Sequence, residues 1–96
     1  MEGVIKVMEK PNYVTECIVH VEGKDAVEEF VKLTSKFDFD VDILDPTRHY
    51  VIDAKSIMGI FSLDLRKDLI LGINLAGSAV DEFKESINKF IVNGGE

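Results

Sequence analysis

The chain has 96 residues, of which 46% are hydrophobic and 30% are charged, a balance typical of a single domain with one core. It carries 18 acidic and 11 basic residues, a formal net charge of −7, which argues against partners such as nucleic acids or anionic membranes. No apolar run approaches the ~20 residues of a membrane span and no signal peptide is recognised, so we expect a cytoplasmic protein.

In the first third of the chain we expect a short N-terminal segment, a strand and a helix. Residues 1–12 end in a turn signal and form either an N-terminal arm or an extra strand. The alternation of apolar and polar residues over 13–21 predicts a strand. Apolar residues recur at helical spacing over 26–37, with Asp25 as the expected N-cap and Glu28 in the position of a capping box.

A hairpin is expected next. Apolar and acidic residues alternate over 38–45, so that the apolar side chains face the core and the aspartates face water. Pro46 favours a turn, and residues 49–54 return as the second strand. Residues 67–76 alternate again and predict a fourth strand.

The last long helix begins at Ser78, the expected N-cap. Its expected buried stripe comprises Val80, Phe83, Ile87, Phe90 and Ile91. These elements predict an α+β fold, in which both long helices cover one face of a four-stranded, mostly antiparallel sheet.

A short apolar segment stands between the third and fourth of these strands and is not needed for the sandwich. It begins at Ser56, whose hydroxyl is a good N-cap for a short helix. Ile57, Met58 and Phe61 share one side of a helical turn. They either pack down on the sheet or stand exposed as a small patch for binding a partner.

The stretches "FVKLTSKFDFDVDI", "YVIDA" and "AKSIMGIFSLDL" resemble HPr, the histidine-containing phosphocarrier protein of the bacterial sugar phosphotransferase system. The similarity extends from Tyr13 to Val92. The order βαββαβα is also that of HPr, an open-faced two-layer sandwich. The chain is therefore divided into residues 1–12, an arm or extra strand, and residues 13–96, an HPr-like domain.

The resemblance also implies a departure from the family. HPr accepts its phosphoryl group on a histidine in the loop before the first long helix, and the matching position here is Gly23; the family's arginine position is Asp25. A carboxylate repels the phosphoryl group that an arginine would hold. We therefore interpret Gly23, Lys24 and Asp25 as a degenerate active-site loop. The alternative is a working phosphocarrier that uses His20 or His49.

Ser56 matches the serine that a dedicated ATP-dependent kinase phosphorylates in HPr of Gram-positive bacteria, where the phosphorylated form binds a transcriptional regulator of sugar use. Ile57, Met58 and Phe61 match the apolar patch through which HPr docks its partners. The resemblance thus implies a regulatory or adaptor protein with a protein partner: a phosphotransferase-system component, a kinase or a regulator. Two alternatives stay open: Ser56 is an unmodified N-cap, or the domain is an α+β binding domain unrelated to phosphotransfer.

Other chemistry is not indicated. Asp38, Asp40 and Asp42 alternate along a strand without the glycine turn and distal glutamate of a calcium loop. Cys17 falls on the inner face of its strand, where a thiol is unreactive. No phosphate-binding loop and no catalytic spacing of residues is recognised. We expect no enzymatic activity, no cofactor and no metal.

Overall fold

The computed structural model describes residues 4–6 and 12–92, and for residues 4–6 it describes the backbone alone. The strands are β1 (Val4–Lys6), β2 (Thr15–Val19), β3 (Asp42–Leu44), β4 (Tyr50–Asp53) and β5 (Leu69–Ile73). The helices are α1 (Lys24–Thr34), α2 (Ile57–Phe61), α3 (Ser78–Ser86) and the 3-10 turn η1 (Asn88–Phe90). From β2 onward, this order is the one that the sequence predicts.

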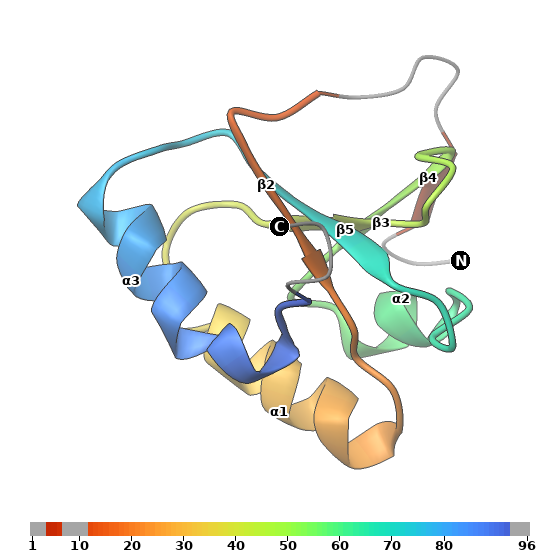
Figure 1. The fold of residues 1–96 in the computed structure, drawn as a ribbon. Coiled ribbons are helices and arrows are strands. Elements are labelled where there is room, and N and C mark those ends of the chain that lie inside the picture. Colours follow the sequence, from red (N-terminus) through yellow and green to blue (C-terminus); the bar gives the residue numbers. More distant parts are fainter. Residues whose placement is uncertain (1–3, 7–11, 93–96) are drawn as a thin grey trace.

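The strands pair in the order β1-β4-β3-β5-β2, and every pairing is antiparallel. The four strands β2 to β5 form the predicted sheet, and β1 adds a fifth strand along β4. The helices α1 and α3 lie on one side of this sheet (Figure 1). The α+β sandwich expected from the sequence is therefore confirmed. Residues 1–3 and 7–11 of the N-terminal segment fall outside the described part of the chain.

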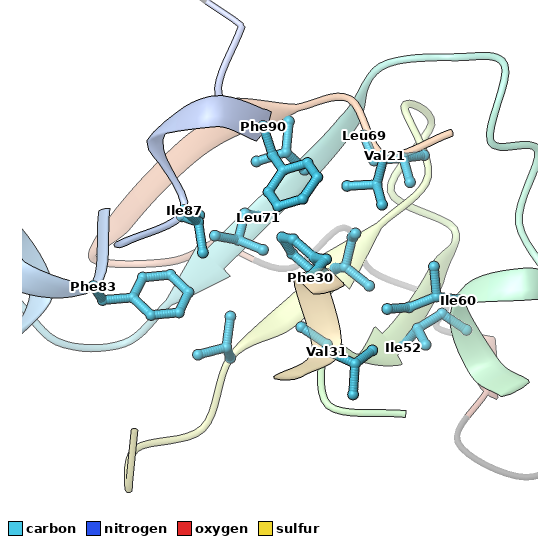
Figure 2. Close-up of a cluster of buried hydrophobic side chains, with 14 of the residues drawn as sticks. Val21, Phe30, Val31, Ile52, Ile60, Leu69, Leu71, Phe83, Ile87 and Phe90 are labelled. Atoms are coloured by element: carbon cyan, nitrogen blue, oxygen red, sulfur yellow. The ribbon is translucent and has the colours of Figure 1, made fainter. Parts of the chain in front are cut away.

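The core lies between the sheet and the helices. One row of paired residues crosses four strands and faces the helices: Cys17, Leu71, Ile43 and Ile52. Phenylalanine rings from the helices pack above this row (Figure 2), with Phe30 and Phe90 edge to face at 5.4 Å between centroids. Such pairs add stability beyond the burial of their surface. The predicted inward faces of the strands and helices are thus observed.

Both predicted N-caps of the long helices are wrong. Asp25 lies inside α1, where Gly23 is the N-cap, and Ser78 is the first residue of α3, where Gly77 is the N-cap. The two glycines have φ of 100° and 120°, values that glycine adopts without steric cost. They turn the chain sharply into each helix, so neither helix has a side-chain cap.

The sheet face away from the helices is less open than expected. Leu44 and Ile70 are paired neighbours on that face and both are buried. The ring of Tyr13 packs against Gly72, and its hydroxyl donates to the Asp42 carboxylate at 2.8 Å. Asp42 was predicted to face water; instead it is partly buried, and this burial raises the pKa of its carboxyl group.

The end of the described chain lies along the free edge of β2. Helix α3 ends at Ser86, earlier than the apolar stripe predicts, and the chain tightens into η1. The His20 amide then donates to the Phe90 carbonyl at 2.8 Å, and the Val92 amide donates to the Ile18 carbonyl at 2.8 Å. Val80, Phe83, Ile87 and Phe90 of the predicted stripe are buried, because η1 keeps Phe90 against the core, while Ile91 is only partly buried.

Candidate functional site

Ser56 is the N-cap of α2, as predicted. The Ser56 backbone is extended, and its Oγ accepts a hydrogen bond from the Gly59 amide at 3.1 Å. This bond satisfies one of the amides that the first turn of a helix leaves free. The segment is thus a short, capped helix between β4 and β5.

A glycine brings α2 close to the sheet. Gly59 and Ile60 are buried, and α2 packs against β4 and α1. A Cβ atom at Gly59 would lie 2.6 Å from Cγ2 of Ile52, closer than two carbon atoms can approach without displacement. Glycine is therefore what allows α2 to seat Ile60 in the core.

Three of the four large side chains of α2 point outward. Ile57 is 41% exposed, Met58 70% and Phe61 46%. We refer to these three residues as the α2 patch. Of the two interpretations that the sequence left open, packing on the sheet or exposure, the structure supports exposure. Adjacent exposed apolar side chains of this kind are a common feature of protein-binding surfaces.

The residues before α2 are tied to the end of α1. Thr34 Oγ1 donates to the Ala54 carbonyl at 3.1 Å. The Lys55 ammonium donates to the carbonyls of Phe37 at 2.7 Å and Phe39 at 3.0 Å. These bonds hold the start of α2 at a fixed place on the body of the domain.

The predicted degenerate loop forms the turn into α1. The Gly23 carbonyl accepts from the Val27 amide at 3.0 Å. Glu22, Lys24 and Asp25 are exposed beside it. The turn contains no histidine and no arginine, and its basic side chain is that of Lys24.

His20 is close to this turn, but both of its ring nitrogens are already bonded. Nδ1 lies 2.9 Å from Oδ1 of Asp68, and Nε2 lies 3.0 Å from Oε1 of Glu22. Hydrogen bonds to Glu22 and Asp68 raise the pKa of His20 above its ordinary value of 6.5. Asp68 could not be found from local spacing, because it is 48 residues away along the chain. Glu22, two residues after His20, lies at the spacing of side chains that share one face of a strand.

His49 lies elsewhere. It is exposed in the turn between β3 and β4, where its backbone amide donates to Thr47 Oγ1 at 3.3 Å. Cys17 is partly buried on the inner face of β2, and burial raises the pKa of its thiol. Among residues 4–6 and 12–92, no three His, Cys, Asp or Glu side chains are grouped so as to hold a metal ion. No helix in the described part of the chain is long and apolar enough to cross a membrane.

Comparison with known protein families shows to which family the chain belongs. A scan against protein-family models matches residues 24–93 to PTS-HPr, described as "PTS HPr component phosphorylation site". This match covers well over half of the chain. The chain belongs to the HPr family. Searches of curated proteins and of solved structures found no match.

Membership in the HPr family confirms the resemblance seen in the sequence and relates the chain to the phosphotransferase system. HPr is a phosphocarrier protein rather than a catalytic enzyme. The matched region begins at Lys24, directly after Gly23, and includes all of α2. The family match therefore contains the α2 patch but not Gly23.

Proposed function

We propose that this HPr family member is a regulatory or adaptor protein that binds a protein partner through the α2 patch and does not pass phosphoryl groups through the turn before α1. The exposure of Ile57, Met58 and Phe61 on a helix whose other residues are held in the core supports this proposal. By resemblance to HPr, the partner is a phosphotransferase-system component, a kinase or a transcriptional regulator, met in the bacterial cytoplasm.

The α2 patch is large enough to matter in binding. Fully covering one large apolar side chain is worth about 1.5–3 kcal/mol. Since the three side chains are between 41% and 70% exposed, covering them together offers on the order of 2–4 kcal/mol. A few such residues commonly dominate the energy of an interface.

The turn before α1 supports the loss of phosphoryl transfer. Gly23 carries no nucleophile, and Asp25 places a negative charge at the start of the helix. Transfer through His20 would require an incoming phosphoryl group to displace Glu22 or Asp68 from the ring and then remain beside both carboxylates. Like charges at such distances repel each other.

Ser56 is the candidate for regulation. Its hydroxyl already bonds the Gly59 amide, and a phosphoryl group there would add a charge of roughly −1.5 to −2 directly beside the α2 patch. We propose that this charge selects between partners, as the resemblance to kinase-regulated HPr implies. The alternative, an N-cap that is never modified, predicts no change in mass with any kinase.

The first experiment measures the mass of the intact protein after two incubations, one with phosphoenolpyruvate and enzyme I and one with ATP and the HPr serine kinase. A phosphoryl group gained only with the kinase, and lost in Ser56→Ala, is the expected result. A gain with phosphoenolpyruvate that disappears in His20→Gln or His49→Gln would show a working phosphocarrier and overturn the proposal.

The second experiment tests the α2 patch against a matched control. Met58→Glu and Val14→Glu introduce the same charge at side chains of similar exposure, 70% and 65%, but only Met58 belongs to α2. Binding to a purified phosphotransferase-system regulator, with and without Ser56→Asp, is measured by calorimetry. We expect Met58→Glu to weaken binding at least tenfold and Val14→Glu to leave it unchanged; equal effects would contradict docking through α2.

A further inference from the structure

A histidine and two carboxylates join separate parts of the fold beside the start of α1. His20 follows the end of β2, Glu22 lies in the turn into α1, and Asp68 directly precedes β5. The imidazole bonds both carboxylates, Asp68 at 2.9 Å and Glu22 at 3.0 Å. In the proposed function the cluster only opposes phosphoryl transfer through His20 and has no role of its own.

The number of protons on the ring decides how many of these bonds exist. Carboxylates at neutral pH only accept hydrogen bonds, and a neutral imidazole has a single N–H. Only the imidazolium form can donate to both Asp68 and Glu22. When His20 loses a proton, the lone pair of one nitrogen faces a carboxylate, and that contact becomes repulsive.

We propose that His20 is a proton-operated clasp, which ties the turn into α1 to the turn into β5 when its ring is protonated and releases one of them when the ring is neutral. The backbone of His20 stays fixed in both states, because its amide donates to the Phe90 carbonyl at 2.8 Å. The parts that move are Glu22, next to Gly23, or Asp68.

Of the surrounding charges, Arg66 also attracts the Glu22 carboxylate, while the hydrogen bonds to the ring come from the two carboxylates. On the turn before β5, Arg66 is held by Asp64, with Nε 3.0 Å from Oδ1. On η1, the Lys89 ammonium is held by Glu29 of α1 at 2.7 Å. The remaining charged residues on the two turns are Lys24, Asp25 and Lys67. Within residues 12–92, only Glu22 and Asp68 lie within hydrogen-bond distance of the ring.

The clasp closes as the pH falls. The hydrogen bonds to Glu22 and Asp68 raise the pKa of His20 above 6.5, so the ring is protonated and the clasp closed below that pH. The clasp opens as the pH rises through the raised pKa. Histidine is well suited to this role, since modest shifts move its titration across neutral pH.

An NMR titration of the full chain between pH 5 and 9 tests this proposal. The imidazole resonances of His20 are followed in the native protein, in Glu22→Gln, in Asp68→Asn and in the double variant. His49, exposed in its turn, reports any general effect of pH. We expect a His20 midpoint above 6.5 that falls in each single variant and falls furthest in the double variant.

The amides of residues 21–24 and 67–69 give the second readout. Their chemical shifts are expected to change with the same midpoint as the His20 ring, and this change is expected to vanish in His20→Gln. A His20 midpoint at or below 6.5, or one that the double variant leaves in place, would overturn the proposal. The proposal would also be overturned if the amide chemical shifts in both turns did not change with the midpoint of the His20 ring.

Discussion

His20 lets a single proton influence the stability of the fold. Because the folded-state pKa is raised, protonation stabilises the folded state; this contribution is complete below pH 6.5 and disappears as the pH rises through the folded-state value. We expect the free energy of unfolding of the native protein to exceed that of His20→Gln at pH 6 and the difference to shrink towards pH 8.5. Urea denaturation at four pH values measures it; a constant difference would contradict the linkage.

Gly59 has a different role, which is steric. In Gly59→Ala the added methyl group would lie 2.6 Å from Ile52 Cγ2 and 3.0 Å from Ser56 Oγ. Overpacking of this kind costs about 1–3 kcal/mol, part of which is offset by the better helix propensity of alanine. We expect a net loss of about 1–2 kcal/mol in denaturant unfolding, against less than ~0.5 kcal/mol for the exposed Ile57→Ala. Equal losses would show that α2 does not depend on this close approach.

The contacts of His20 and of Gly59 differ in whether they can be predicted from the sequence. A glycine inside a short apolar segment favours close approach of a neighbouring element, so the role of Gly59 is within reach of the sequence, although its contact with Ile52 is not. The contact of His20 with Asp68 could not be predicted, because Asp68 is brought to it by the pairing of β2 with β5 rather than by local spacing. Equally, spacing grouped Ile57, Met58 and Phe61, but their exposure depends on how α2 is seated on the body of the domain.

At the scale of elements, Lys55 fixes α2 to the end of α1. Its ammonium holds the carbonyls of Phe37 and Phe39. Lys55→Met keeps most of the side-chain length and removes both bonds, at an expected cost of about 1–2 kcal/mol. We expect faster hydrogen exchange at the Gly59 and Ile60 amides, with Lys67→Met as the control. Unchanged exchange would contradict a fixed start for α2.

The order and type of the elements could be predicted because each helix and strand shows its own periodicity of apolar residues. The residues at which the helices begin and end could not be predicted. Gly23 and Gly77 cap helices through positive φ rather than through a side chain, which removes the signal that placed the caps at Asp25 and Ser78. Helix α3 also stops early, because the chain must turn at η1 to bond β2.

At the scale of the whole molecule, residues 90–92 complete the sheet. Phe90 is buried against Phe30, and Ile91 forms a bridge with Val19 of β2. Truncation after Lys89 removes both contacts, and we expect it to lower the free energy of unfolding by about 3–5 kcal/mol, the usual cost of losing a buried phenylalanine. Lys89→Ala, which removes only the exposed pair with Glu29, should cost less than ~1 kcal/mol. Calorimetric melting compares them; similar melting temperatures would contradict this role for residues 90–92.

The outer edge of β2 also affects folding during synthesis on the ribosome. Strand β2 is synthesised before its partner β5, which begins at Leu69, and before residues 90–92, which bond its outer edge in the described part of the chain. An unpaired strand edge invites pairing with other chains, and contacts between distant segments form slowly. A nascent chain on the ribosome therefore carries β2 unprotected until these segments follow, and chaperone binding to β2 should persist until residues 90–92 have emerged.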